Sequence, residues 1–304
     1  MRSWGKVSLT DRFQYREALL QHVDFHWQSP DGLRLYGQAW EPETAPAAVV
    51  CLVHGLGEHS GRYAHVAAAL NAAGYALLGF DLRGHGKSGG PRGHTPSYDI
   101  LMDDISHLLD EARTRYPDRP LFLYGHSLGG NLALNYALRR KPQLAGVIST
   151  SPALRTATPP PAWKITLGKL MYKIQPGMQM ANGLDRDGLA RDPEVVRAYA
   201  SDPLVHDRIS ARLALDMLQT GEWALAHAAE FPSIPLLLVH GTADRLVSAK
   251  ATQEFASKIR GDCTLKLWDD FYHETHNEPQ KAQVLAFMVD WLQRHTRRPE
   301  WGNA

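Results

Sequence analysis

Cysteine is scarce in this sequence, with two residues in 304, and no hydrophobic run approaches the length of a membrane-spanning helix. Cys51 and Cys263 lie in apolar segments far apart in the sequence, which predicts two reduced core side chains. Residues 1–15 contain no continuous apolar stretch of the kind that a signal peptide needs. We therefore expect a soluble, cytoplasmic protein, with any attraction to membranes being local and peripheral.

An excess of charge is also lacking, because the formal net charge is +1 and the pI is about 7.9. No overall electric field would draw such a chain to nucleic acid, so we expect no nucleic-acid partner. Hydrophobic residues make up 44% and charged residues 21%, a balance typical of a soluble globular enzyme with a large core.

Apolar runs and helical patterns alternate along most of the chain. Runs 23–27 and 33–40 flank a turn at 29–32, which predicts an antiparallel hairpin at the start of the sheet. Later buried runs alternate with helical segments, which indicates an α/β fold with a mostly parallel sheet of about eight strands and helices on both faces. These later runs are 47–53, 75–81, 121–124, 146–150, 235–240 and 264–268.

Residues 153–232 have a different pattern, with three consecutive prolines, several short helical stretches and no convincing strand. This pattern predicts a helical insertion over one end of the sheet. We expect residues 1–152 to form the first part of a core, 153–232 the insertion, and 233–304 the second part of the core.

A candidate nucleophile lies between a predicted strand and a predicted helix. Residues 125–129 read Gly-His-Ser-Leu-Gly, and this motif in a strand, turn and helix context indicates a nucleophile elbow. The small glycines allow the strained turn that exposes the hydroxyl of Ser127. The motif alone recurs by chance, so its placement carries the prediction; the alternative is an ordinary loop serine.

A serine nucleophile needs a base, and the base needs an acid that orients it. Asp244 and His273 each follow a predicted strand, so both belong to loops at the carboxyl edge of the sheet. We predict Asp244 as the acid and His273 as the base, with His276 as the rival. His273 and His276 show no metal-binding pattern, and no metal is expected.

Acyl transfer also needs two backbone donors for the oxyanion. Leu128 follows the nucleophile, and Leu56 lies in the loop 54–57 after an earlier strand, so their N–H groups are the candidates. Residues 84–89 match a dinucleotide-binding glycine pattern, but no helix follows at once. A structural turn is the better interpretation there, and no cofactor is expected.

The motifs resemble the monoacylglycerol lipase and lysophospholipase family of serine hydrolases, over about residues 32–292. The most specific segment is 54–63, which reads His-Gly-Leu-Gly-Glu-His-Ser-Gly-Arg-Tyr. Further matching segments are 80–86, 125–129, 201–204, 243–246 and 272–278. The resemblance implies an α/β-hydrolase fold in which the insertion forms a cap over the site, and a lipid ester as the substrate.

In that family, the positions matching Glu58, Arg62 and His276 lie near the polar head of the substrate, and the alternative is a salt-bridged loop. Trp163 and Ile174 belong to an apolar stripe on one face of a predicted helix. The interpretations are packing in the core, lining of an acyl tunnel, or transient contact with a lipid interface.

The resulting hypothesis is a two-step ester hydrolysis through an acyl-enzyme, most simply of monoacylglycerol to fatty acid and glycerol. Lysophospholipase activity, short-chain esterase activity and acyl transfer to an alcohol are the enzymatic alternatives. A catalytically silent binding module on the same fold is the alternative from another class. The sequence does not indicate an oligomeric state.

Overall fold

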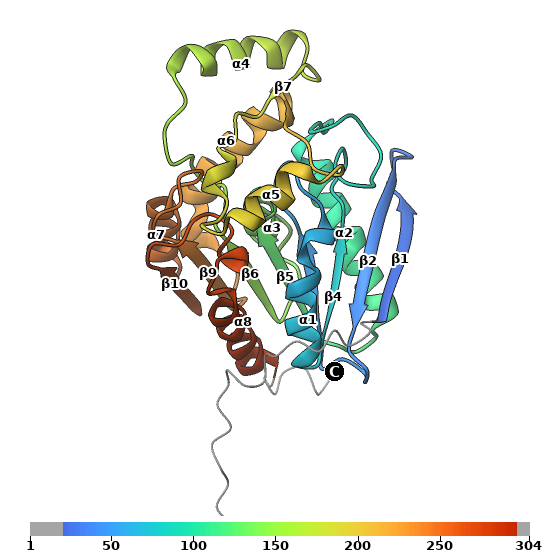
Figure 1. Cartoon of the computed structure of the whole chain (residues 1–304). Coiled ribbons are helices and arrows are strands. Elements are labelled where there is room, and N and C mark those ends of the chain that lie inside the picture. Colours follow the sequence, from blue (N-terminus) through green and yellow to red (C-terminus); the bar gives the residue numbers. More distant parts are fainter. Residues whose placement is uncertain (1–20, 297–304) are drawn as a thin grey trace, which may run out of the picture.

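The strands of the main sheet are β1 (Gln21–Gln28), β2 (Arg34–Glu41), β3 (Ala48–Val53), β4 (Tyr75–Phe80), β5 (Leu121–His126), β6 (Gly146–Thr150), β9 (Leu236–Gly241) and β10 (Cys263–Trp268). The structure, a computed structural model, describes residues 21–296. The strand order is β1, β2, β4, β3, β5, β6, β9, β10 (Figure 1). The first two pairings, β1 with β2 and β2 with β4, are antiparallel, and every later one is parallel. The prediction of a mostly parallel sheet of eight strands is confirmed.

Helices pack on both faces of this sheet, and β3 shows how alternate side chains serve the two layers. Val49 and Cys51 belong to one buried cluster, which includes side chains of α2, α3 and α7. Val50 and Leu52 belong to the other, with α1 and α8. Successive strand residues point to opposite faces, so a continuous apolar run is what a doubly covered strand requires. These helices are α1 (Ala64–Ala72), α2 (Tyr98–Arg115), α3 (Leu128–Arg140), α7 (Ala249–Lys258) and α8 (Lys281–Thr296).

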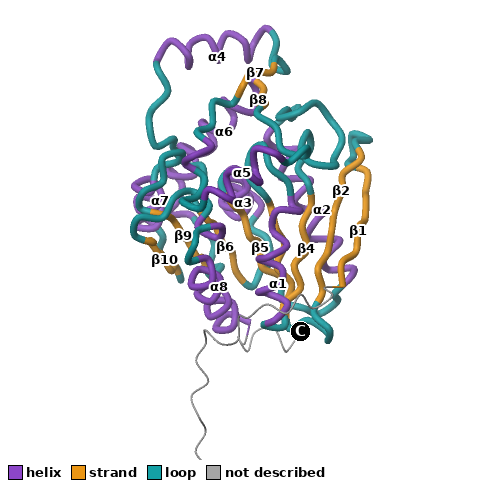
Figure 2. The backbone as a smooth tube through the Cα atoms, viewed as in Figure 1, coloured by secondary structure: helices purple, strands orange, loops and turns teal. Residues whose placement is uncertain are grey.

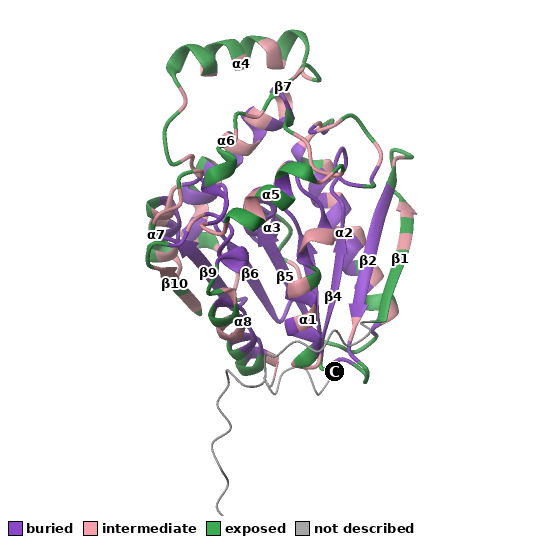
Figure 3. Ribbon diagram, in the orientation of Figure 1, coloured by how far each residue is buried: buried purple, intermediate pink, exposed green. Residues whose placement is uncertain are grey.

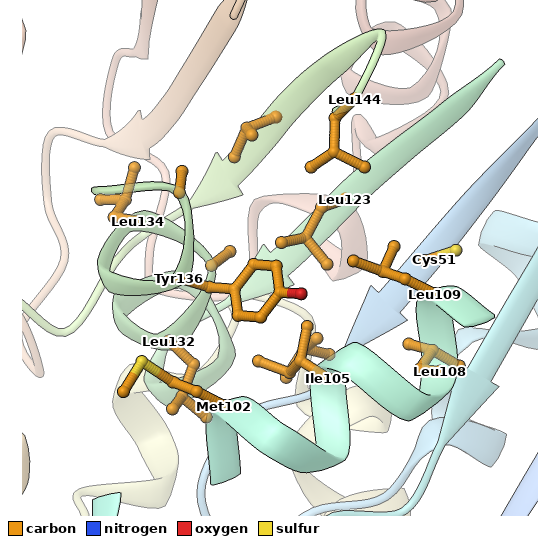
Figure 4. Packing of buried hydrophobic residues seen from close by; sticks show 14 of the residues in the cluster. Cys51, Met102, Ile105, Leu108, Leu109, Leu123, Leu132, Leu134, Tyr136 and Leu144 are labelled. Carbon is orange, nitrogen blue, oxygen red and sulfur yellow. The ribbon is translucent and has the colours of Figure 1, made fainter. Parts of the chain in front are cut away.

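The first cluster is seen from close by in Figure 4, where Ile105 and Leu109 of α2 face Leu123 of β5 and Cys51 of β3. Both cysteines are free, and Cys51 is fully buried as predicted. Cys263 is only partly buried, because β10 is an edge strand of the sheet. The expectation of a core side chain at Cys263 is therefore wrong in degree.

Short polar side chains begin several helices, which explains where the periodic segments start. Ser97 accepts a hydrogen bond from the N–H of residue 100, Ser210 from residue 213 and Ser248 from residue 251, each at 3.2 Å. Such caps satisfy otherwise unpaired N–H groups and stabilise a helix by about 1 kcal/mol each. At the other end of α1, Gly74 adopts a φ of 84° and closes the turn into β4.

The segment between β6 and β9 contains α4 (Ala162–Ile174), β7 (Gln179–Ala181), α5 (Pro193–Ser201), β8 (Arg208–Ser210) and α6 (Ala211–His227). Figure 2 shows these elements and long loops at the upper end of the sheet, with α4 outermost. Strands β7 and β8 pair antiparallel. The expectation of no strand in this segment is wrong, because three-residue strands are too short to leave a period in the sequence. Short 3-10 turns complete the chain: η2 (Ser60–Tyr63), η3 (Arg186–Gly188), η4 (Ala228–Glu230) and η5 (Thr275–Asn277).

Burial differs sharply between these layers, as Figure 3 shows: the central strands are buried, whereas most of α4 is exposed. Within residues 21–296, no helix combines the length and the apolar character that crossing a bilayer requires. The expectation about residues 1–15 lies outside the described part of the chain.

Candidate active site

Ser127 occupies the tight turn between β5 and α3. Its backbone has φ 54° and ψ −115°, a conformation that non-glycine residues rarely adopt. A Cβ on Gly125 would lie 2.1 Å from the carbonyl oxygen of Gly129, and a Cβ on Gly129 would lie 2.0 Å from that of Val53. Both glycines are therefore required for the close approach of strand, turn and helix, as the elbow motif predicts.

The predicted acid and base meet across two neighbouring loops. Asp244 follows β9, His273 follows β10, and Asp244 Oδ2 lies 2.7 Å from His273 Nδ1. Both side chains are buried. This contact uses Nδ1 of the imidazole, so Nε2 remains to exchange a proton with a nucleophile.

One contact joins the loop of His273 to the elbow, and a second joins it to the residue after β6. The ring of His126, the residue before Ser127, lies 4.8 Å from the His273 ring, centroid to centroid. The hydroxyl of Ser151 donates to the backbone oxygen of His273 at 2.7 Å. The Ser127 hydroxyl itself forms no hydrogen bond with a described residue, so the Asp244–His273 pair is assembled while the serine–histidine bond is not. Such bonds often tighten only when substrate binds.

Electrostatics keep Asp244 ionised. Burial alone would raise the pKa of its carboxyl group, but His273 and His240 outweigh burial and bring the pKa well below the ordinary value. Oδ1 also accepts the backbone N–H groups of Leu246 and Val247, at 2.7 and 3.0 Å. For His273, burial lowers the pKa, whereas the Asp244 carboxylate raises it, and the net pKa lies above the ordinary value.

A second imidazole, which no sequence motif indicated, also contacts Asp244. His240 Nε2 lies 3.0 Å from Asp244 Oδ2, and His240 Nδ1 lies 2.7 Å from the Thr252 hydroxyl. The available signal was a histidine at the carboxyl end of an otherwise aliphatic strand, four residues before the predicted acid. Because the chain has fifteen histidines, that position did not stand out from the others.

The two candidate oxyanion donors lie on adjoining segments. Leu128 is the first residue of α3, so its N–H has no partner within the helix. Leu56 lies in the loop after β3, and the Gly129 approach to Val53 brings that loop against the elbow. Leu56 and Ser127 are partly exposed among buried neighbours, and a Cβ on Gly55, next to Leu56, would lie 3.2 Å from the Cβ of Ser127.

The three predicted head-group residues do not form one polar surface. Arg62 bridges Glu58 and Glu274, with N–O distances of 2.5 Å to Glu58 and 2.7 Å to Glu274. All three side chains are at most 10% exposed. His276 is buried and stacks on the ring of Tyr63, with centroids 5.0 Å apart. This arrangement favours the salt-bridged alternative, and head-group contact by Glu58, Arg62 and His276 stays a prediction.

The buried ion group links the two loops of the site. Glu58 Oε1 accepts the N–H of Gly55 at 2.7 Å, beside the candidate donor Leu56, and Glu274 follows His273 directly. Burial alone would raise the pKa of Glu274, but the Arg62 guanidinium lowers it well below its ordinary value. We call Glu58, Arg62 and Glu274 the buried brace. Glu274 was not identified from the sequence.

The glycine-rich segment 84–89 closes on Asp81. Asp81 Oδ1 accepts the N–H and hydroxyl of Ser60 at 2.8 and 2.6 Å, and Oδ2 accepts the N–H of Lys87 at 2.8 Å. A Cβ on Gly86 would lie 2.1 Å from Asp81 Oδ2. These contacts fit the interpretation of the segment as a structural turn.

Comparison with known proteins places this chain in a family. The model of a family described as serine aminopeptidase, S33, matches residues 44–280. A monoacylglycerol lipase of Mycolicibacterium smegmatis is 35% identical over 87% of this chain and 94% of its own length. An uncharacterised abhydrolase domain-containing protein of Dictyostelium discoideum is 41% identical over 84% of this chain, which spans only 27% of that longer protein.

Solved structures agree with the sequence comparison. The monoacylglycerol lipase of Paleococcus ferrophilus superposes with a TM-score of 0.76 and 35% identity, covering 91% of this chain and 99% of that one. The resemblance inferred from the motifs is thereby confirmed: this chain belongs to the serine aminopeptidase S33 family of α/β-hydrolases and is similar to the monoacylglycerol lipases within it.

Proposed function

We propose that this chain hydrolyses the ester bond of monoacylglycerols, releasing a fatty acid and glycerol, with Ser127 as nucleophile, His273 as base and Asp244 as orienting acid. Its membership among the hydrolases and its lipase relatives make it a carboxylic ester hydrolase. The observation that carries the proposal is the 2.7 Å contact between Asp244 and His273, formed beside the strained turn at Ser127. A silent binding module would have no use for that pair.

The reaction proceeds in two balanced steps. The Ser127 oxygen attacks the ester carbonyl while His273 Nε2 takes the hydroxyl proton, and the same proton then passes to the departing glycerol oxygen. Water next attacks the acyl-enzyme, with His273 taking one of its protons and returning it to Ser127 as the fatty acid leaves. The ionised Asp244 stabilises the imidazolium in both steps.

We propose the backbone N–H groups of Leu56 and Leu128 as the donors for the oxyanion. Leu128 lies at the N-terminus of α3, where the helix leaves N–H groups unpaired and carries partial positive charge. Backbone donors need no reorganisation during the reaction, and removing one such donor typically costs about 10² to 10³ in rate. Their leucine side chains are not part of this role.

Residues 153–232 are proposed as the cap over the site, between core parts 1–152 and 233–304. The upper position of α4, α5 and α6 in Figure 1 supports this division. Helix α4 has no buried residue, and Trp163 and Ile174 are 64% and 68% exposed. Lys164 and Lys173 accompany this apolar surface. We infer that α4 makes transient contact with the lipid interface from which substrate is taken.

Acyl chain burial dominates the affinity in this proposal. Each buried methylene contributes about 0.8 kcal/mol, whereas a net hydrogen bond contributes about 0.5 to 1.5 kcal/mol. Discrimination between head groups should therefore be modest. We further propose a cytoplasmic enzyme, peripheral at membranes, which agrees with two cysteines that are both free.

A substrate panel tests the proposed function. Monoacylglycerols, lysophospholipids and short-chain p-nitrophenyl esters are compared at matched concentration, and the highest kcat/KM is expected for monoacylglycerol. Ser127→Ala should lower kcat by about 10⁶ and leave the fold intact, whereas Ser257→Ala, at an exposed serine of α7, should have no effect. If lysophospholipid or acetate esters were preferred, monoacylglycerol would not be the substrate. An active Ser127→Ala variant would contradict the mechanism.

A further inference from the structure

His240 is a polar residue at the carboxyl end of an apolar strand. Strand β9 reads Leu-Leu-Leu-Val-His-Gly, all six residues are buried, and the His240 side chain is 0% exposed. An imidazole in such a place loses its hydration, so both ring nitrogens need partners within the protein. Its presence here is costly unless it serves the neighbouring carboxylate.

The partners of His240 determine which nitrogen carries the proton. Asp244 is ionised and can only accept, so His240 Nε2 must be the N–H that donates to Oδ2 across 3.0 Å. In the tautomer whose only ring proton is on Nε2, Nδ1 accepts a hydrogen bond from the Thr252 hydroxyl across 2.7 Å. Thr252 lies on α7 and is fully buried, so no water competes for this hydroxyl.

Both oxygens of Asp244 are thus fixed from two sides. Oδ1 accepts two backbone N–H groups of the following turn, from Leu246 and Val247. Oδ2 accepts both imidazoles, His240 and His273. The donor from His240 acts on the same atom that holds the base, so it affects both the direction of that oxygen and the negative charge that His273 meets.

We propose that His240, oriented by the hydroxyl of Thr252, is a positioning residue that holds Oδ2 of Asp244 in line with His273. The inference rests on the proposed function, because it assigns His240 an effect on the same acid and base. It adds a second layer to the site: α7, a helix with no residue in the triad, sets the direction of the carboxylate through Thr252 and His240.

Removal of the donor has two expected consequences. A hydrogen bond to a charged group is worth about 1.5 to 3 kcal/mol, so His240→Leu should lower kcat roughly 10- to 100-fold, with little change in KM. The carboxylate in this variant is less neutralised at Oδ2 and stabilises the imidazolium of His273 more strongly. The acid limb of the kcat/KM profile should therefore move to higher pH, by about half a unit. The other titratable groups facing His273 are His126, Glu274 and Glu58, which stay unchanged.

The test compares His240→Leu with His240→Gln, whose amide can donate where the imidazole Nε2 does. A soluble short-chain ester removes any contribution of the cap to the rate. Partial recovery of kcat and of the wild-type acid limb in His240→Gln is expected. Equal kcat and equal acid limbs in wild type and His240→Leu would overturn the proposal, as would an acid limb that moves to lower pH.

Thr252→Val provides a second variant in case His240→Leu fails to fold. It removes only the hydroxyl that orients the ring, and a smaller loss of kcat, about threefold to tenfold, is expected. Gln253→Ala, at the exposed neighbour on α7, is the matched control. If the kcat and the pH profile of Thr252→Val equalled those of the wild type, the proposal would be contradicted. Failure of the proposed function is separate, because it would leave Ser127→Ala as active as the wild type.

Discussion

The carboxyl edge of the sheet, which we call the rim, and helix α4 differ in which kinds of side chain they bury. At the rim, even charged groups such as Asp244 and Glu274 are buried, and other protein groups neutralise them. In α4, large apolar side chains such as Leu167 and Leu170 are exposed, although the same residue types fill the core of β9. Protein groups therefore surround the proposed acid, and the apolar surface that we propose for lipid contact lies in a helix with no buried residue.

The largest effect should come from the rim itself. Asp244→Asn keeps the size of the side chain but no longer stabilises the imidazolium or selects its tautomer, so kcat should fall by about 10⁴. Turnover of a soluble ester measures this loss, and circular dichroism checks that the fold persists. A loss of less than tenfold would show that Asp244 is not the acid of the site.

The buried brace should make the next largest difference, and in stability rather than chemistry. Arg62→Met leaves Glu58 and Glu274 buried without their cation, which should cost about 3 to 5 kcal/mol of unfolding free energy in urea. Arg197→Met is the control, because its pair with Glu194 is exposed and should be worth less than about 1 kcal/mol. Equal losses for the two variants would contradict the structural role of the brace.

The brace also predicts a pH dependence with a definite sign. The pKa of Glu274 is depressed in the folded state, so its contribution is present above the unfolded value of 4.5 and is lost as pH falls below it. Unfolding free energy should thus decline on acidification, by about 1.4 kcal/mol per pH unit for each such group. Glu274→Gln should flatten this decline between about pH 4.5 and 2.5. An unchanged slope would mean that other carboxylates control acid unfolding.

The smallest effect should come from α4 and should depend on the substrate's physical state. Leu167→Ser with Ile174→Ser should lower hydrolysis of monoacylglycerol in vesicles about tenfold, because roughly 1 to 2 kcal/mol of apolar contact is lost. Hydrolysis of a soluble ester should not change. A loss on both substrates would place these side chains in the chemistry of the site rather than at the lipid surface.

Local sequence patterns could predict the sheet and the elbow because both depend on neighbouring residues. The Gly-His-Ser-Leu-Gly motif predicts the turn, since the close backbone contacts at positions 125 and 129 leave no room for any residue but glycine. The order of β9, Asp244, β10 and His273 places the proposed acid and base at one edge, since parallel strands end together.

Long-range pairings and exposure could not be predicted in the same way. The pairing of Arg62 with Glu274 joins residues 212 apart, and no local pattern indicates it. The apolar stripe on α4 has the same helical period whether it packs in a core or faces solvent. The exposure of Trp163 could therefore be seen only in the structure. Strands β7 and β8 form only by pairing with each other, so neither has a sequence pattern of its own.

The most direct test of the central claim is to locate the reactive serine by mass spectrometry after treatment with a fluorophosphonate. The wild-type protein should carry one phosphonyl adduct, on Ser127, and should lose hydrolytic activity in proportion to labelling. Asp244→Asn and His273→Ala should react far more slowly, because the base no longer activates the hydroxyl. An adduct on another serine, or full activity in a protein completely labelled at Ser127, would contradict the account.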